Sequence, residues 1–444
     1  MKIWIVASLL AVACLAVYWP HRDAQFVLDD YYTVVRNPLI KNPSLYSRIW
    51  TSRLFDASAS SGYIKFGYYR PLLESSWILD YRLFGLKACG YQYINLLIHV
   101  LNCLLIYTLF LMIFNQPSLA LKAALLFGLL PSQEWVVRYV TGRGDELSAL
   151  FGFMGLIFLT RSLKTGFKQG HLLAFICLGL AALSREVALS YVLYALLIYY
   201  YIKGQVRGLN RFCGWWLFIG VLPLAVIWSI VPKQGNILIG HIFYFTSAGF
   251  CLWVAQWPAR RVIVFLFLFT AVSFYQGRFW STEEILLRHT RSLEWWPHTV
   301  IDQQLLMKYD DDIPAVKKMA RRSLNPLIKA MWLRRLGMIC FKRGDLPGAA
   351  RYFGQALSVD PLDVDSLDAL AVVAHDQGEE QQSLAFLRRA LTLNPVYPET
   401  LRTLGIHYYI YKDFSRARLF LSRCLFFDPD DAQAAKLLGS LPTR

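Results

Sequence analysis

Charged residues are scarce in this chain. They make up 17% of its 444 residues, whereas hydrophobic residues make up 56%. A soluble globular domain has a charged share of about 25%. The net charge is +16, but the lysines and arginines are spread among apolar segments and no run of five basic residues occurs. This pattern argues against nucleic acid as a partner and indicates a membrane protein with a soluble part.

Cysteine pairs are also lacking. None of the eight cysteines belongs to a C-x-x-C pair, and most lie in or beside apolar segments. The sequence therefore predicts neither a metal site nor a disulfide framework, although it leaves a divalent metal at the active site undetermined. Cys14 ends a weak lipidation signal, but the apolar run continues past it to Trp19 and has no A-x-A cleavage site. An uncleaved signal anchor is the better interpretation.

Nine apolar segments predict a polytopic helical membrane domain. Some are shorter than the roughly 20 residues of a spanning helix, so either one hairpin is re-entrant or these helices extend into their polar flanks. The segments are residues 3–19, 93–114, 119–130, 147–159, 171–183, 187–202, 215–231, 237–257 and 262–275.

Loop charges predict the orientation of this domain. Lysine and arginine concentrate in the loops around residues 161–168, 203–211 and 260–261, and such loops are usually cytoplasmic. The N-terminus is then cytoplasmic, and the loop at residues 20–92 lies outside with everything after the ninth segment. We expect a multi-pass protein of the bacterial inner membrane, or of the endoplasmic reticulum membrane in a eukaryote, with a periplasmic or lumenal C-terminal part.

A repeat of 34 residues follows the membrane segments. It appears in Asp360-Pro361, Asn394-Pro395 and Asp428-Pro429, and it is the tetratricopeptide repeat length. Each helix pair must stack on its neighbour to bury its apolar face, which predicts an α-solenoid of about three repeats and a capping helix. Its groove would bind a protein or peptide partner; alternatively, the solenoid only docks on its own membrane domain.

The predicted fold is therefore all-α, with three parts. Residues 1–280 form the membrane domain, and residues 20–92 form its outer loop with short amphipathic helices. Residues 281–320 form connecting helices, and residues 321–444 form the solenoid.

An acidic pair follows the first apolar segment, in Phe26-Val-Leu-Asp-Asp-Tyr31. For an arbitrary pair, the default interpretation is that Asp29 or Asp30 caps the next helix. A position just outside the membrane also suits a general base that takes a proton from an acceptor hydroxyl.

The order of these parts resembles the transmembrane-and-TPR O-mannosyltransferase-like proteins of the GT-C glycosyltransferase superfamily. The similar strings run in the same order through most of the chain. After the acidic pair they are Asn37-Pro38, Tyr68-Tyr-Arg-Pro-Leu72, Leu83-Phe-Gly-Leu86, Tyr93-Ile-Asn-Leu-Leu-Ile-His-Val-Leu-Asn102, Gly142-Arg-Gly-Asp-Glu146, Leu183-Ser-Arg-Glu186, residues 243–249, Arg278-Phe-Trp280 and Trp296-Pro297.

This resemblance implies a GT-C-like fold and transfer of a sugar from a polyprenyl phosphate to an acceptor, in its commonest form a mannose-like sugar to a protein hydroxyl. It also implies Asp29 as the general base, with Asp30 as second choice. Two departures from the family pattern raise the chance of a catalytically inactive descendant. Members of this family usually have a histidine beside the proline at the position of Leu130-Pro131, and this chain does not. The stretch from Trp228 to Ile242 is also very short, whereas relatives have extra membrane segments there.

Further site residues are predicted from the outer loops. Arginines there could hold the donor phosphate, because guanidinium groups pair bidentately with phosphate oxygens. Each could equally be a snorkelling or loop-capping residue. The candidates are Arg143, Arg185, Arg138 and Arg70 for the phosphate, and Glu134, Asp145, Glu146, His99 and His241 for the cleft. For the two histidines, packing within the helices is the more usual role.

The leading hypothesis is a membrane glycosyltransferase whose partners are the bilayer, a polyprenyl-phosphate lipid and a protein acceptor. The alternative is an inactive membrane scaffold whose repeats recruit a partner in envelope or surface-appendage assembly. A transporter comes third, because broken helices at corresponding positions of two halves are not evident.

Overall fold

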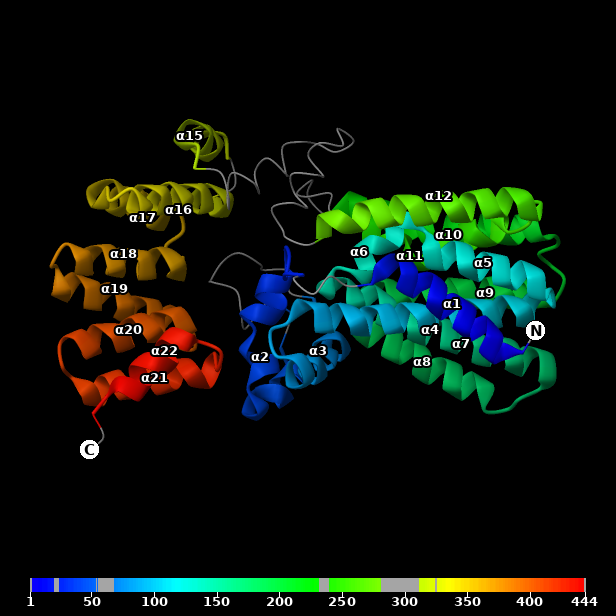
Figure 1. Cartoon of the computed structure of the whole chain (residues 1–444), viewed down its shortest axis with the longest axis horizontal. Helices are drawn as coiled ribbons and strands as arrows, with labels where there is room; N and C mark the ends of the chain where they lie inside the picture. The colour runs from blue at the N-terminus through cyan, green and yellow to red at the C-terminus, as the bar shows by residue number, and fades with distance from the viewer. Residues whose placement is uncertain are drawn as a thin grey trace. The chain divides into compact units, whose positions relative to one another are not determined.

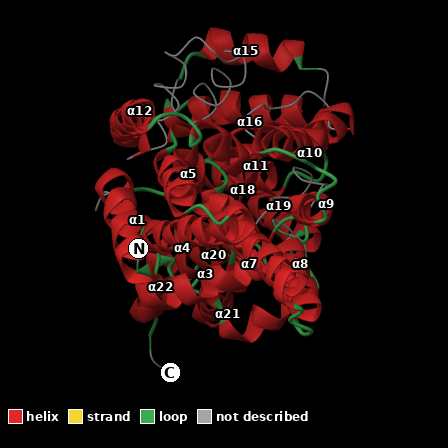
Figure 2. Cartoon of the chain, turned by 90° about the vertical axis from the view of Figure 1, so that its right-hand side faces the viewer, coloured by secondary structure: helices red, strands yellow, loops and turns green. Residues whose placement is uncertain are grey.

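Every regular element that the structure describes is helical (Figures 1 and 2). The computed structural model describes residues 2–19, 24–52, 54, 68–230, 239–280, 311–323 and 326–442. The predicted fold class, a helical membrane domain followed by a helical solenoid, is confirmed. Most of the predicted connecting stretch, residues 281–310, lies outside the described residues.

The chain packs as two compact units. The first, here called the membrane unit, combines Met1–Tyr31 with Tyr69–Leu286; the second, the repeat unit, combines Tyr32–Tyr68 with Leu287–Arg444. Part of the predicted outer loop thus packs with the repeats, a grouping that the order of segments in the sequence does not reveal. The predicted domain boundaries themselves stay a prediction.

The membrane unit contains eleven labelled helices among the described residues. They are α1 (Ile3–Tyr18), α3 (Pro71–Phe84), α4 (Ala88–Phe114), α5 (Pro117–Leu129), α6 (Glu134–Val137), α7 (Arg143–Thr165), α8 (Gly170–Ser184), α9 (Tyr191–Ile202), α10 (Leu209–Ile230), α11 (Ile239–Val254) and α12 (Ala259–Gly277).

Three stretches of the described chain are long and apolar enough to cross a membrane: Ala88–Phe114, Val140–Thr165 and Ala259–Gly277. Shorter apolar helices accompany them, among them α1, α5 and α8. The protein is therefore a membrane protein, whereas the count of nine passes stays a prediction. Residues 231–238, in the short step between Trp228 and Ile242, lie outside the described residues.

Aromatic side chains fill the core of the membrane unit. The ring of Phe245 in α11 stacks on Phe153 of α7, with centroids 4.3 Å apart, and on Trp216 of α10, at 5.5 Å. Tyr194 of α9 packs against the same two rings of α10 and α11. Such rings bury large apolar areas and hold the surrounding helices in one arrangement.

The described part of the repeat unit contains three stacked helix pairs. They are preceded by α2 (Pro38–Lys41) and α15 (Ile313–Arg322). The pairs and the last helix are α16 (Pro326–Lys342) with α17 (Leu346–Val359), α18 (Val364–Asp376) with α19 (Glu380–Leu393), α20 (Pro398–Ile410) with α21 (Phe414–Phe427), and α22 (Ala432–Ser440).

Small residues recur every 34 positions where the two helices of a pair cross. Gly337, Ala371 and Gly405 occupy this position. A Cβ on Gly405 would lie 2.6 Å from Cδ2 of Leu421 in α21, and one on Gly337 would lie 2.6 Å from Cε1 of Phe353 in α17. Close crossing of the helices therefore requires a small side chain here.

The turn between the two helices of each pair also repeats every 34 residues. Gly344 and Gly378 have φ angles of 77° and 81°, and Lys412 takes the third position with a φ of 60°. Glycine enters this left-handed region without steric cost, whereas lysine does not. The third turn is therefore the strained member of the set.

Candidate active site at the acidic pair

The acidic pair lies on a strained turn. Leu28, the residue before Asp29, is buried and has a φ of 54°. A non-glycine residue in this region is uncommon and persists only where its surroundings hold it. The turn separates the two carboxylates, because Asp29 is exposed while Asp30 is 1% exposed.

Asp30 anchors this turn to the chain that leads into α7. Its Oδ1 accepts hydrogen bonds from the backbone N–H and the hydroxyl of Thr141, both at 2.8 Å, and its Oδ2 accepts one from the N–H of Val27 at 3.2 Å. Burial raises the pKa of Asp30 to about 7, although these hydrogen bonds oppose the shift. A carboxyl bonded in this way has little freedom to approach a substrate.

Helix α4 holds the loop to which Asp30 is bonded. Gln92 donates a hydrogen bond to the carbonyl of Arg138 at 2.8 Å, and Asn95 donates one to the carbonyl of Tyr139 at 3.0 Å. The hydroxyl of Tyr139 in turn accepts a hydrogen bond from the N–H of Asp29 at 3.3 Å. The backbone of Asp29 is therefore held by Tyr139, and the residue is exposed.

All four predicted phosphate-binding arginines pair with carboxylates of the chain. The shortest N–O distances are 2.8 Å for Arg70–Glu186, 2.7 Å for Arg138–Glu134, and 2.5 Å for both Arg143–Asp80 and Arg185–Asp145. Their role in binding a phosphate stays a prediction, and each would first have to exchange or share its carboxylate.

Two of these arginines lie deep in the structure. The side chain of Arg143 is fully buried and donates to Asn95 Oδ1 at 2.7 Å and to the carbonyl of Tyr91 at 2.9 Å. Arg138 donates to the carbonyl of Val17 at 3.0 Å, at the end of α1. These bonds join α3, α4 and α7 in one case and α1 and α6 in the other, so both arginines support the fold.

Arg70 is also buried, but its carboxylate partner is more exposed than those of the other three arginines. Its Nε and Nη2 donate to the two oxygens of Glu186 at 3.0 and 2.8 Å, in the bidentate geometry that a phosphate would also accept. The Glu186 side chain is 45% exposed, whereas the carboxylates that pair with the other three arginines are at most 7% exposed. Among the four pairs, Glu186 can most easily be displaced into water.

The predicted cleft carboxylates are buried. Glu134 is 1% exposed, and burial raises its pKa to about 7 despite the neighbouring Arg138. Asp145 is occupied by Arg185, and Glu146 is fully buried at the start of α7. Their presence in a cleft stays a prediction, because these contacts place them inside the fold.

Of the two predicted histidines, His99 lies in the core of the membrane unit. His99 is fully buried, with its Nδ1 2.8 Å from the hydroxyl of Tyr244 and its Nε2 3.2 Å from the carbonyl of Gly128. Both ring nitrogens therefore have partners, as in a packed histidine. The side chain of His241, at the start of α11, lies outside the described residues.

His99 also belongs to a cluster that cysteine spacing could not reveal. The potential ligand atoms of Cys14, His99 and Cys103 lie within 4.8 Å of one another, at the contact of α1 with α4. A metal at Nε2 would have to displace the bond to Gly128, so the hydrogen bonding favours packing over ligation.

Sequence reasoning missed the residues that hold the turn and occupy the arginines. Thr141, Tyr139, Asp80 and Glu186 lie between 63 and 116 residues from their partners in the chain. Neither helical periodicity nor motif spacing could connect them, although Glu186 stands in the Leu183-Ser-Arg-Glu186 string.

The fold and site define a class of protein. It is a helical membrane protein with helical repeats after its membrane helices, and an acidic pair lies on a fixed turn just after its first apolar helix. No family model matches the chain. Particular relatives do match part of it, and the resemblance predicted from the sequence is confirmed over that part.

These relatives are named protein O-mannosyl-transferases. TMTC1 of Mus musculus is 29% identical over 167 residues, 36% of this chain and 17% of the mouse protein. F38B6.6 of Caenorhabditis elegans is 27% identical over 157 residues, 34% of this chain and 23% of that protein. Human TMTC4 is 26% identical over 180 residues, 37% of this chain and 24% of that protein. The matches thus span about a fifth of the relatives' length.

Proposed function

We propose that this protein is a membrane glycosyltransferase that moves a sugar from a polyprenyl-phosphate donor to a protein hydroxyl at the periplasmic or lumenal face. The proposal is supported by the partial similarity to proteins named protein O-mannosyl-transferases. The observation that carries it is the geometry of the acidic pair, where an exposed Asp29 is held beside a buried, triply bonded Asp30.

In the proposed reaction, the acceptor oxygen attacks the anomeric carbon of the sugar. The bond from that carbon to the phosphate oxygen breaks, and the phosphate leaves with the electron pair. Asp29 takes the proton of the acceptor hydroxyl as general base. A cation must stabilise the charge that develops on the leaving phosphate.

Asp29 suits the role of base better than Asp30. Asp29 is exposed, whereas both oxygens of Asp30 already accept hydrogen bonds from Thr141 or Val27. We therefore assign Asp29 to the chemistry and Asp30 to positioning it.

Arg70 is the best of the four candidates for the donor phosphate. A phosphate that replaced Glu186 would find the same bidentate donors, and the released carboxylate could move into water because it is 45% exposed. Displacement of Asp80 from Arg143 would instead leave a carboxylate that is 1% exposed without its ion pair, which is strongly unfavourable.

The test is a transfer assay with the full chain in membranes, a polyprenyl-phosphate mannose and acceptor peptides. Asp29→Asn should lower the rate about a hundred- to ten-thousand-fold, the usual contribution of a general base. Asp376→Asn, at an exposed carboxylate in α18, is the matched control and should keep the wild-type rate. An unchanged rate in Asp29→Asn would remove Asp29 from the mechanism.

Orientation needs a separate test, for which a position in the repeats is suitable. Gln382 in α19 is exposed, whereas its neighbour Ser383 is buried against the carbonyl of Ala371. Gln382→Cys should react with a membrane-impermeant maleimide from the periplasmic or lumenal side. Reaction from the cytoplasmic side alone would reverse the proposed topology.

The second candidate function is an inactive membrane scaffold. The specific observation in its favour is that all four predicted phosphate ligands already pair with carboxylates. Mass spectrometry of the purified protein distinguishes the two functions. Retention of a polyprenyl-phosphate lipid, weakened in Arg70→Ala, supports the transferase; absence of lipid and of transfer with all polyprenyl-phosphate sugars supports the scaffold.

A further inference from the structure

Helix α15 closes one end of the stack of repeats. It lies beyond α16, the first helix of the first pair (Figure 1). Val316 and Ala320 of α15 are buried in the same core as the apolar residues of α16, and Ile313 and Met319 pack against that core. The apolar side of α15 is therefore covered within the repeat unit, whereas its opposite side is exposed.

That exposed side is basic, and we call it the basic face. Its lysines and arginines line a depression with a volume of about 430 Å³, together with the first two residues of the helix, Ile313 and Pro314. Every polar side chain that lines this depression therefore has a positive charge. The four exposed cations are Lys317, Lys318, Arg321 and Arg322.

The positive charge continues onto α17. The Nζ atom of Lys317 lies 6.0 Å from the centre of the Tyr352 ring, and the guanidinium carbon of Arg351 lies 4.9 Å from the centre of the same ring. Arg351 is exposed. One aromatic ring thus holds two cations from neighbouring helices, which widens the basic surface beyond α15.

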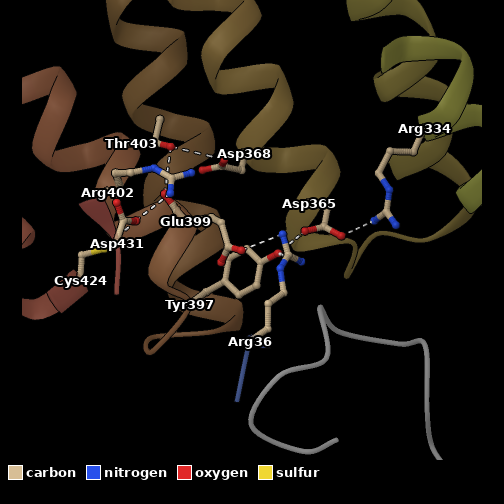
Figure 3. Close-up of polar contacts among 10 residues, drawn as sticks. All are labelled: Arg36, Arg334, Asp365, Asp368, Tyr397, Glu399, Arg402, Thr403, Cys424 and Asp431. Atoms are coloured by element: carbon tan, nitrogen blue, oxygen red, sulfur yellow. Dashed lines mark hydrogen bonds and ion pairs between the residues drawn. The ribbon is translucent and has the colours of Figure 1, made fainter. Parts of the chain in front are cut away.

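Other arginines of the repeat unit are neutralised by carboxylates of that unit. Figure 3 shows three of them, each with a nitrogen 2.7 Å from a carboxylate oxygen: Arg36 with Glu399, Arg334 with Asp365 and Arg402 with Asp431. On the basic face, by contrast, Lys318, Arg321 and Arg322 have no carboxylate partner in the part of the chain that the structure describes. These three charges are open to water.

The acidic residues just before α15 are used elsewhere. Asp312 caps the helix by accepting a hydrogen bond from the N–H of Ala315 at 3.1 Å. Asp311 lies 2.8 Å from Nη2 of Arg335 in α16. The carboxylates nearest to the basic face in the sequence therefore stabilise the helix and its packing rather than neutralise the four cations.

The spacing of these cations costs stability. Lys317 and Arg321 are four residues apart, as are Lys318 and Arg322, and like charges at this spacing repel each other on a helix. The helix dipole compensates cations in the last turn, which contains Arg321 and Arg322 but neither lysine. A bound anion would relieve the repulsion among all four.

We propose that the basic face of α15 is a docking surface for the phosphate headgroups of anionic lipids. The chain is already anchored in a bilayer: α12, one of the candidate spans, ends at Gly277, and residues 278–312 connect it to α15. This connection keeps lipid headgroups at a high effective concentration around α15. A cluster of basic residues on one side of an amphipathic helix is typical of surfaces that bind anionic lipids.

The docking should be electrostatic and superficial. The apolar residues of α15 pack inside the repeat unit, so they do not enter the hydrocarbon as those of an inserted amphipathic helix do. High salt should therefore weaken the docking. Neither the lipid contact nor its test depends on the proposed transfer reaction.

The test places a reporter beside the basic face of the full chain in lipid nanodiscs. Pro314 is exposed and lines the depression. A fluorophore is attached to Pro314→Cys, in a chain with Cys89→Ser to lower the background, and nitroxide groups on the lipid headgroups quench it when α15 docks. Quenching should be stronger in discs that contain phosphatidylglycerol than in discs of phosphatidylcholine alone.

Removal of two cations should weaken the docking about 25-fold, because each lysine or arginine near an anionic surface contributes about fivefold. The variant is Lys318→Gln with Arg322→Gln, and the measurement is the ratio of quenched to unquenched fluorophore. The matched control, Arg388→Gln with Lys436→Gln, removes the same charge from exposed positions in α19 and α22 and should leave the quenching unchanged. Lys318→Arg with Arg322→Lys keeps the charge and should dock as the wild type does.

Equal quenching in the two kinds of disc would overturn the proposal. An equal loss in the control variant would overturn it as well, as would unchanged quenching at about 1 M salt, where charges are screened within about 3 Å. Polyglutamate is a second probe, added to discs without quencher. If it changes the fluorescence at position 314 while phosphatidylglycerol has no effect, the basic face binds acidic protein and the lipid proposal fails.

Discussion

The membrane unit and the repeat unit place their arginine–carboxylate pairs differently. In the repeat unit, Arg334 reaches Asp363 and Arg402 reaches Asp431, each 29 residues further along the chain. In the membrane unit, Arg143 reaches back to Asp80 and Arg70 reaches forward to Glu186, with no common spacing. In a repeat fold, residues at a fixed spacing in the sequence become neighbours in space. The membrane helices have no such repeat, so the spacing between paired residues varies.

The two kinds of pair should also differ in energy. The side chains of Arg143 and Asp80 are at most 1% exposed, whereas in the repeat unit those of another pair, Arg416 and Asp413, are 61% and 37% exposed. Loss of one partner from a buried pair leaves an uncompensated charge in the interior. A pair open to water is solvated when it breaks and contributes little. The membrane unit should therefore depend more on individual arginines.

Arg143→Ala should give the largest loss of stability, about 3–5 kcal/mol, because Asp80 remains buried without its partner. Arg416→Ala, at the exposed pair of the repeat unit, should lose about 1 kcal/mol or less. Thermal unfolding of the full chain in detergent, followed separately in each unit by a site-specific fluorophore, compares the two. Equal losses would mean that the difference in burial has no energetic consequence.

Gly405→Trp should destabilise the repeat unit by about 1–3 kcal/mol or more, because the helices of the third pair cross closely at this position. Gly405→Ala should have a smaller effect, since Ala371 occupies the same position one repeat earlier. Gly354→Trp is the control, because its Cβ would meet nothing within 4 Å. Similar unfolding temperatures for Gly405→Trp and Gly354→Trp would contradict the assigned crossing.

Asp30 and Asp431 should change stability with pH in opposite directions. Burial raises the pKa of Asp30 to about 7. As pH rises from about 4 to 7, the unfolded chain therefore loses a proton that the folded chain keeps, and Asp30 makes the protein less stable. Burial also acts to raise the pKa of Asp431, but hydrogen bonds from the N–H of Ala434 and from Arg402 lower it overall. The ionised carboxylate of Asp431 therefore stabilises the folded protein above about pH 4, and this stabilisation is lost as the pH falls.

Substitution by asparagine separates these two effects. Asp30→Asn should remove part of the decline in stability between about pH 4 and 7, and Asp431→Asn should remove part of the loss below about pH 4. The measurement is the unfolding temperature of each variant relative to wild type across this range. Slopes of the same sign in both variants would contradict the assigned environments.

Lys412→Gly should give the smallest effect, a stabilisation of at most about 1 kcal/mol. It relieves the left-handed backbone of the third turn, but glycine also loses more conformational freedom on folding. The other two turns already have glycine at this position. Lys329→Gly in α16, where no left-handed backbone is required, should instead destabilise by about 1 kcal/mol. A loss of stability in Lys412→Gly would contradict the inferred strain.

The sequence predicted best what depends on neighbours in the chain or on a fixed period. The helices of the repeats and the small residue at position 405 follow from the 34-residue spacing, because stacked repeats must bury the same face each time. The all-α fold follows from long apolar segments, whose backbone groups must be hydrogen-bonded within the membrane. The acidic pair was also visible, as a string just beyond the first apolar segment.

Tertiary structure alone decided how each of these charges is used. Asp29 and Asp30 are the same residue type and adjacent in the sequence. In the fold, the turn at Leu28 leaves Asp29 exposed and places the Asp30 carboxylate against Thr141. Arg36 and Lys41 read as ordinary loop residues, but they are bonded to repeats more than 350 residues away. Burial and pairing arise from the whole fold, and a carboxylate or guanidinium has the chemistry that its surroundings in that fold impose.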